Sequence, residues 1–232
     1  MITVRHASER GQSRSSWLEG YHTFSFAGYH DPRHMGFHDL RVINEDRVQP
    51  GGGFGTHSHR DMEIVSWVLN GVLEHKDSLD NGSLIRPGDV QRMTAGTGVT
   101  HSEYNHSCDE VVRFLQIWIL PEQEGLKPSY EQKNFPEADR LNSLRLITSR
   151  DGADGSVTVH QDASLYSSIL ETGRNISHEP ELDRHLWLQL TRGAVTILGE
   201  SLAQGDGAAI SGEEIVEMRA DQQSELLLFD LG

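Results

Sequence analysis

The stretch GGGFGTHSHRDMEI (residues 51–64) places two histidines, His57 and His59, a single serine apart behind a run of glycines. In a helix, residues two positions apart project about 200° from each other, so their side chains cannot reach one ion. On a strand the same two residues lie on one face, about 7 Å apart along the chain, and their imidazoles can converge on one metal. The stretch therefore predicts a strand that carries half of a metal site.

A second pair repeats this spacing in AGTGVTHSEYN (residues 95–105), where His101 and Glu103 lie two positions apart after another glycine-rich turn. Two such strands facing each other across a small barrel bring together three imidazole nitrogens and one carboxylate, which suit a first-row divalent metal. Four protein ligands leave two positions open on an octahedral ion, so the predicted site is reactive rather than purely structural. Glu63 has the same strand parity as His59 and competes with Glu103 for the fourth position.

The rest of the chain shows short apolar runs rich in β-branched residues, separated by turns that contain glycine or proline. This pattern predicts an all-β fold, a sandwich or a barrel. The segment 123–143 is polar, contains two prolines and follows neither the helical nor the strand period, so we interpret it as a linker. It separates a metal-binding domain at residues 1–122 from a second domain at residues 144–232. The second domain repeats a strand–glycine–strand pattern but lacks the HSH motif, so we expect a duplicated barrel without a metal site.

Composition excludes several classes of function. Hydrophobic residues make up 36% of the 232 residues and charged residues 24%, as in globular proteins. A net charge of −15 without a Lys/Arg cluster argues against direct contact with nucleic acid. Cys108 is the single cysteine, which excludes an intramolecular disulfide. No apolar run approaches the roughly 20 residues of a membrane span, and the first residues lack an apolar signal sequence, so we expect a cytoplasmic protein.

The remaining histidines and aromatic residues have simpler interpretations. Four histidines have a helical spacing but sit in turn-like sequence, so we expect no second metal site from them: His22, His30, His34 and His38. We expect hydrogen-bonding or surface roles for His75 and His106. Barrel packing, with a share in the walls of a pocket, is expected for Phe54, Met93 and Trp118.

Two longer blocks carry a family resemblance. GGGFGTHSHRDME…NG resembles the first cupin motif, which is filled here by Gly51, His57, His59, Glu63 and Gly71. GDVQRMTAGTGVTHSEYN resembles the second motif, but it has Thr94 where proline is usual and two extra residues before the histidine. These two departures, together with the block HTFSFAGYHDP…MGFHDLRVINEDRV (residues 22–48), make the sequence similar to the pirin family rather than to cupins at large. The resemblance covers nearly the whole chain.

The pirin resemblance implies a bicupin, with two β-barrel (double-stranded β-helix or jelly-roll) domains in one chain, of which the second has lost its metal. It implies that His57, His59, His101 and Glu103 are the metal ligands, which favours Glu103 over Glu63. We expect iron(II) in the site, with nickel, cobalt, manganese, copper and zinc as alternatives. A monomer is expected, because each cupin half can cover the open face of the other.

The same resemblance implies two activities. Similar bacterial pirins act as quercetin 2,3-dioxygenases, oxidoreductases that open the flavonol ring with O₂ and release carbon monoxide. In that activity Glu103 is also the catalytic residue that accepts the proton of the flavonol 3-hydroxyl. The alternative is a regulatory protein that binds metal and acts through a protein partner without turning over a substrate, as the nuclear pirin of animals does. In the dioxygenase activity quercetin can stand in for an unidentified enediol-like substrate.

Overall fold

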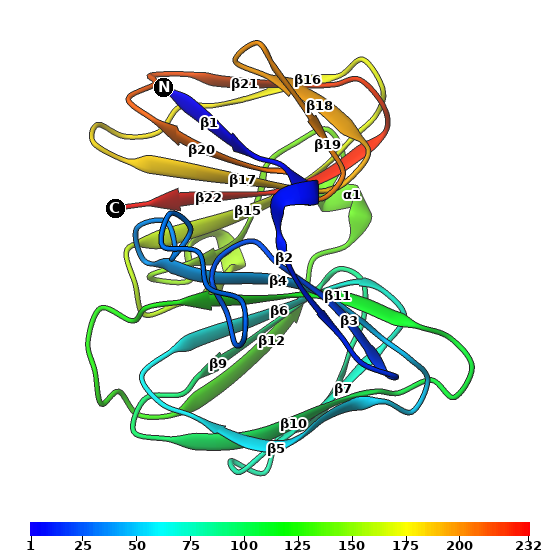
Figure 1. Ribbon diagram of the computed structural model, residues 1–232. Coiled ribbons are helices and arrows are strands. Elements are labelled where there is room, and N and C mark those ends of the chain that lie inside the picture. The colour runs from blue at the N-terminus through cyan, green and yellow to red at the C-terminus, as the bar shows by residue number, and fades with distance from the viewer. The chain divides into compact units, whose positions relative to one another are not determined.

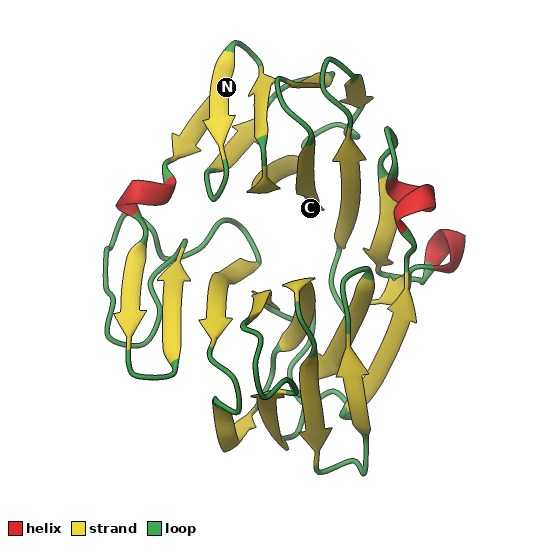
Figure 2. Ribbon diagram, turned by 90° about the vertical axis from the view of Figure 1, so that its right-hand side faces the viewer, coloured by secondary structure: helices red, strands yellow, loops and turns green.

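The computed structural model describes residues 1–232, and nearly all of its regular secondary structure is β-strand, joined by loops and turns (Figure 2). Its three helices are short: η1 (Ala7–Glu9), α1 (Glu137–Arg140) and η2 (Ala153–Gly155). None of them has the length and apolar character that crossing a membrane requires. The predicted all-β fold is confirmed.

The chain divides into two compact units. The N-terminal unit comprises Gly11–Asn134 and Val157–Gln161, and the C-terminal unit comprises Met1–Arg10, Phe135–Ser156 and Asp162–Gly232. The short segment Val157–Gln161 is tied to the N-terminal unit through its backbone, since Arg92 Nε donates to the Thr158 carbonyl over 2.7 Å. The domain boundaries expected from the linker sequence stay a prediction.

The N-terminal unit contains a seven-stranded sheet in the order β12-β9-β6-β11-β4-β3-β2 and a four-stranded sheet in the order β5-β10-β7-β8 (Figure 1). Its strands are β2 (Gly11–Arg14), β3 (Leu18–His22), β4 (Leu40–Val48), β5 (Gly53–His59), β6 (Glu63–Asn70), β7 (Leu73–Asp77), β8 (Gly82–Ile85), β9 (Asp89–Thr94), β10 (Val99–Asn105), β11 (Val112–Ile119), β12 (Ser129–Asn134) and β14 (Val157–Thr158).

The C-terminal unit repeats this topology. Its larger sheet has the order β1-β20-β17-β22-β15-β13, and its smaller sheet has the order β16-β21-β18-β19. Its strands are β1 (Ile2–Arg5), β13 (Arg145–Ser149), β15 (Ala163–Leu170), β16 (Asn175–His178), β17 (His185–Arg192), β18 (Ala194–Ile197), β19 (Glu200–Ala203), β20 (Gly207–Ser211), β21 (Val216–Ala220) and β22 (Ser224–Leu231). The duplication inferred from the strand–glycine–strand pattern is therefore present in the fold.

Equivalent positions in the two units follow from two matching hairpins, β6–β7 in the first unit and β17–β18 in the second. Each of these hairpins turns at a glycine with a left-handed backbone, Gly71 (φ +78°) and Gly193 (φ +83°). Counting back from these glycines aligns Ser66 of β6 with Leu188 of β17. Their cross-strand partners are Gln116 in the first unit and Leu228 in the second.

The N-terminal barrel thus has the polar pair Ser66 and Gln116 where the C-terminal barrel has two leucines, and the interiors of the two barrels differ accordingly. Leucines, valines and isoleucines fill the C-terminal barrel, where Leu188 and Leu228 belong to one continuous buried cluster. In the N-terminal barrel a smaller cluster that includes Val68 and Phe114 closes one part of the interior. Another part is a cavity of about 490 Å³, within the size range of small-molecule sites.

Candidate metal centre

The site is built on two neighbouring antiparallel strands, β5 and β10, whose register pairs His57 with His101. The same pairing brings Gly53 so close to β10 that a Cβ atom there would meet the Glu103 carbonyl oxygen at 2.4 Å, so this position requires glycine. The register shifts between His101 and Glu103, where β5 carries an irregularity around Gly55. The glycine-rich approach to the first motif thus allows the close contact of the two strands.

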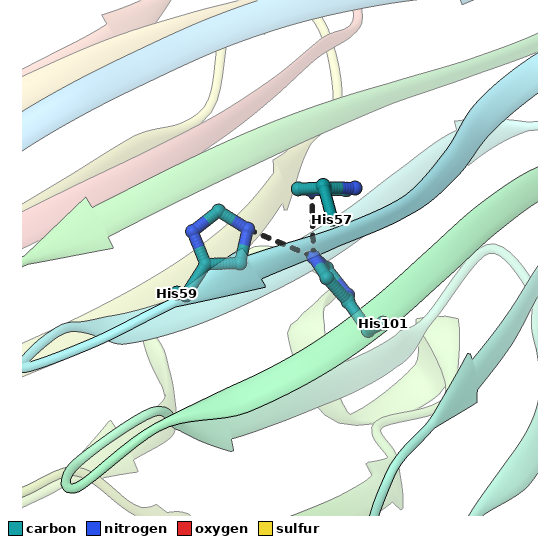
Figure 3. A group of neighbouring side chains, drawn as sticks. All are labelled: His57, His59 and His101. Carbon is teal, nitrogen blue, oxygen red and sulfur yellow. Dashed lines mark hydrogen bonds between the residues drawn. The ribbon is translucent and has the colours of Figure 1, made fainter.

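Three imidazoles converge on one point (Figure 3), His57 and His59 from β5 and His101 from β10. His101 Nε2 lies 2.9 Å from His59 Nε2 and 3.0 Å from His57 Nε2. Nitrogens bound at about 2.1 Å in perpendicular directions around one metal are separated by about 3.0 Å. The two distances from His101 Nε2 therefore fit nitrogens in adjacent positions around one octahedral ion.

In two of the rings, those of His57 and His101, the opposite nitrogen has a partner that leaves the Nε2 lone pair free for an ion. His57 Nδ1 lies 2.8 Å from the Gly55 carbonyl oxygen, an acceptor, so Nδ1 carries the proton and Nε2 is free to bind. His101 Nδ1 lies 3.5 Å from His75 Nδ1, and His75 Nε2 lies 3.1 Å from Asp77 Oδ2. If His75 donates to Asp77 through Nε2, its Nδ1 accepts from His101, which leaves the His101 Nε2 lone pair free as well.

Asp77 is well fixed in this arrangement. Its side chain is completely buried, and so is that of His75. Although burial raises its pKa, hydrogen bonds from His75, from the Asn81 side chain and from the backbone N–H groups of Asn81 and Leu79 lower it overall. The carboxylate is therefore held in its charged form at the end of a buried Asp77–His75–His101 chain.

Burial and the neighbouring histidines keep the imidazoles of His59 and His101 neutral. Burial, together with the neighbouring His57, lowers the pKa of His59 to about 4. Burial and the nearby His59, His57 and His75 lower the pKa of His101 to about 2. At neutral pH both rings carry a lone pair rather than a second proton, as metal ligation requires.

Glu103 lies beside the cluster, fully buried on β10. Its Oε1 accepts from Ser66 Oγ over 3.2 Å, and its Oε2 accepts from Gln116 Nε2 over 2.6 Å. Burial raises its pKa to about 7, although these two hydrogen bonds act in the opposite direction. Glu103 and His101 have potential ligand atoms within 4.8 Å of each other. That His57, His59, His101 and Glu103 hold a metal together stays a prediction.

Glu63, the competitor for the fourth position, has a different partner. Its Oε2 accepts from the His160 backbone N–H over 3.2 Å and lies 3.3 Å from His160 Nδ1, both within the N-terminal unit. Glu63 is absent from the residues that cluster as ligand atoms around His101. The contact pairs Glu63 with His160, a residue outside the predicted ligand set.

The cavity opens onto the cluster and combines apolar walls with a polar floor. It is lined by Ser13, Trp17, Leu18, His22, Phe26, Ala27, Asn44, Asp46, Gly53, Phe54, Gly55, His57, His59, Glu103, Gln116 and Trp118. The Trp118 ring lies edge-on to His59 with centroids 5.0 Å apart, and Trp17 lies edge-on to Phe54 at 5.1 Å. Aromatic walls of this kind suit a planar ring system.

The floor of the cavity is a row of polar side chains across four neighbouring strands. Cross-strand register aligns His22 of β3 with Asn44 of β4, Asn44 with Gln116 of β11, and Gln116 with Ser66 of β6. His22 Nδ1 lies 2.8 Å from Asn44 Oδ1, while Gln116 and Ser66 both donate to Glu103. The last two residues of the row therefore hold the Glu103 carboxylate, which lies beside His101.

Other residues considered from the sequence fall into several groups. Phe54 and Trp118 line the cavity, whereas Met93 is fully buried away from it. His75 is buried and contacts His101, and its role was foreseen only as hydrogen bonding. The sequence patterns did not single out Asp77, Asn44 and Gln116, and only Gln116 offered a local signal, as a polar residue between the apolar Leu115 and Ile117.

The C-terminal unit preserves one of the four predicted ligand positions. In the corresponding hairpin and register, His178 takes the place of His57, Val216 that of His101 and Met218 that of Glu103. His178 Nε2 is bound instead to Asp230 Oδ2 over 2.6 Å. Two of the donor positions are thus occupied by side chains that supply no nitrogen or oxygen.

Comparison with known proteins gives matches over both halves of the chain. Residues 3–119 match the family model described as Pirin, and residues 146–231 match that of the quercetinase C-terminal cupin domain. The sequence is 47% identical to a quercetin 2,3-dioxygenase of Escherichia coli K12, over 100% of this chain and 99% of the relative. The solved structure of the bacterial pirin YhhW from E. coli in complex with nickel(II) is 47% identical and superposes with a TM-score of 0.95, covering 100% of this chain and 99% of that one. A quercetin 2,3-dioxygenase from Acinetobacter baumannii shares the fold at 20% identity, with a TM-score of 0.82 over 98% of this chain and 85% of that one.

Proposed function

The chain belongs to the pirin family, and from that premise we propose that it is a metal-dependent dioxygenase that cleaves flavonols such as quercetin at the 2,3 bond with O₂ and releases carbon monoxide. The convergence of three imidazole Nε2 atoms on the wall of an aromatic cavity is the observation that carries the proposal. A purely structural site has four closed ligands, whereas this one opens onto space for a small molecule.

The metal is a divalent first-row ion held by His57, His59, His101 and Glu103. The donor set fits, because three imidazole nitrogens and a carboxylate suit iron, nickel, cobalt or zinc, and nickel(II) is the ion in the YhhW complex. We expect iron(II), since supply in the cell rather than intrinsic affinity commonly decides which metal occupies such sites. When bound, the ion supplies a positive centre that favours the deprotonated form of a flavonol 3-hydroxyl.

Glu103 is the residue that takes the 3-hydroxyl proton. In the metal-free protein burial raises the pKa of its carboxyl to about 7, and a bound cation would lower it, so Glu103 would be a charged base when a substrate hydroxyl reaches it. The hydrogen bonds from Ser66 and Gln116 fix its orientation toward the imidazole cluster. The proton leaves the substrate oxygen and resides on Glu103 until the product departs.

The walls of the cavity orient the ring system and keep water from the reacting carbons. Trp118 stands between the cluster and Phe26, whose ring centroid lies 5.3 Å away. Phe54 flanks the other side against Trp17. These aromatic surfaces hold a flat substrate edge-on to the imidazoles, where its 3-hydroxyl and 4-carbonyl oxygens face the ion position.

The test is O₂ consumption with quercetin, comparing protein loaded with iron(II) or nickel(II), chelator-treated protein and the His101→Ala variant. Uptake that requires both the metal and His101, with carbon monoxide as a product, supports the proposal. Absence of uptake from protein whose bound metal has been measured contradicts it and favours the regulatory alternative, in which the metal controls binding of a protein partner.

A further inference from the structure

Asp46 is the one carboxyl group in the cavity that neither lies at the imidazole cluster nor has a role in the proposed reaction. It lies on β4, two residues beyond Asn44 and on the same face of the sheet, and only 4% of its surface is exposed. Its neighbour on β3 is Gly20, where a Cβ atom would lie 2.7 Å from Asp46 Oδ1. The absence of a side chain at Gly20 thus leaves room for this carboxyl.

Asp46 differs from the other buried acids of the N-terminal unit in receiving no hydrogen bond from the protein. Glu103 accepts from Ser66 and Gln116, Asp77 accepts from several donors, and Glu45 is paired with Arg113 over 2.7 Å. Burying a polar group without a partner costs free energy, so such a group is rarely retained without a use. Burial and the charges of Glu103 and Glu45 raise its pKa to about 7, in agreement with this isolation.

The residues around Asp46 indicate which kind of ligand could donate a hydrogen bond to its carboxyl. Trp17, Leu18 and Phe54 line the same cavity and pack against one apolar cluster. The cross-strand partner of Asp46 on β11 is Phe114, a member of that cluster. A carboxyl beside aromatic walls matches an aromatic ring that carries a hydroxyl, because the ring packs on the walls while the hydroxyl donates to the carboxyl.

We propose that Asp46 is a specificity-determining residue that accepts a hydrogen bond from a ring hydroxyl of the substrate, so that the cavity selects polyhydroxylated planar aromatics over their unhydroxylated analogues. This assignment rests on the proposed function, since it concerns the same cavity. It adds a second point of recognition, separate from the 3-hydroxyl and 4-carbonyl oxygens at the ion position. A site that holds an acceptor for a substrate hydroxyl rejects an analogue without it, because the buried acceptor is then left unpaired.

The test compares two flavonols that share the metal-facing oxygens: quercetin, and 3-hydroxyflavone, which lacks all the other ring hydroxyls. Affinities are measured without O₂ on nickel(II)-loaded protein by quenching of tryptophan fluorescence, since Trp17 and Trp118 line the cavity. We expect the wild type to prefer quercetin by about tenfold or more, and Asp46→Ala to lose about tenfold in quercetin affinity while its affinity for 3-hydroxyflavone is unchanged or improved. Asp46→Asn, which keeps the shape and one acceptor oxygen, should lose part of the preference.

Glu45→Gln is the matched control, because Glu45 is the preceding buried acid on β4 and is paired with Arg113 outside the set of cavity-lining residues. Its preference for quercetin should equal that of the wild type. An unchanged quercetin preference in both Asp46 variants, or an equal loss for both flavonols, overturns the assignment. Selective binding without O₂ uptake supports the role of Asp46 and overturns the dioxygenase, whereas failure of quercetin to bind the wild type overturns both.

Discussion

The Nδ1 atoms of His75 and His101 lie 3.5 Å apart, and this contact joins the imidazole cluster to a buried carboxylate. Beyond His75 stands Asp77, whose charge is stabilised by hydrogen bonds from His75, Asn81 and Leu79. A carboxylate behind a ligand histidine fixes the ring and its tautomer and raises the basicity of the nitrogen that binds the metal. Here the effect is transmitted through a second histidine.

Asp77→Asn is expected to weaken metal binding by about 10- to 100-fold with every predicted ligand intact. Asparagine can donate to His75 Nε2, which permits the opposite tautomer of His75 and turns its Nδ1 into a donor toward His101. The measurement is competition for nickel(II) against a chromophoric chelator. Glu74→Gln is the control, since Glu74 lies on the same strand and is paired with Lys76 and His106 at the surface. Equal nickel(II) affinities in the Asp77 and Glu74 variants would contradict the role of the Asp77–His75–His101 hydrogen-bond chain.

His57→Ala is expected to empty the metal site and leave the fold intact. The side chain is partly exposed and packs mainly against the other two imidazoles, so its loss creates no core cavity. Metal content is measured by elemental analysis of protein purified in parallel with the wild type. The matched variant is His178→Ala, which removes the histidine at the equivalent register position of the C-terminal unit and should keep its metal. Retention of metal by His57→Ala would contradict the predicted ligand set.

The two glutamates that compete for the fourth position can be separated by Glu103→Gln and Glu63→Gln. We expect Glu103→Gln to lower metal affinity by at least about tenfold, because a neutral amide replaces a negative ligand. Glu63→Gln should bind metal as the wild type does and lose stability instead, since Glu63 is buried and bound to His160. Metal titration and thermal unfolding of both variants make the comparison. The reverse pattern would assign the fourth position to Glu63.

Strand periodicity explains how much of this site was predictable. The alternation of side chains across a strand is a local property, so the spacing of His57 and His59, and of His101 and Glu103, was enough to put each pair on one face. The all-β fold and the duplication follow from equally local patterns of apolar runs and glycine turns.

Other parts of the site depend on which strands become neighbours. The row formed by His22, Asn44, Gln116 and Ser66 exists only because β3, β4, β11 and β6 adjoin in one register. The partner of Glu63 comes from a segment distant in the chain, and nothing in the spacing around either residue indicates it. Register and strand order are set by the packing of the whole barrel, so single-strand patterns do not contain them.

Asp46 gives a final prediction, in which stability depends on pH. Its pKa is raised from the ordinary 3.8 to about 7 by burial and by the charges of Glu103 and Glu45. Below about pH 4 the carboxyl is protonated in both the folded and the unfolded chain, so it has no effect on the pH dependence. As the pH rises from about 4 to about 7, the unfolded chain releases this proton while the folded protein keeps it, so the folded protein loses stability relative to the unfolded chain.

The Asp46→Asn variant has no proton to release at this position. Its free energy of unfolding should therefore exceed that of the wild type by an amount that grows as the pH rises. In metal-free protein at pH 8 we expect the variant to be more stable by at least about 1 kcal/mol, which raises Tm by about 2–4 °C for a chain of this size. Near pH 4 the difference should fall toward zero. Thermal unfolding of both proteins at the two pH values measures it, with Glu45→Gln as the control for loss of a neighbouring charge. A Tm difference that stays constant between pH 4 and pH 8 would show that the Asp46 carboxyl is not isolated from hydrogen-bond donors in the folded protein.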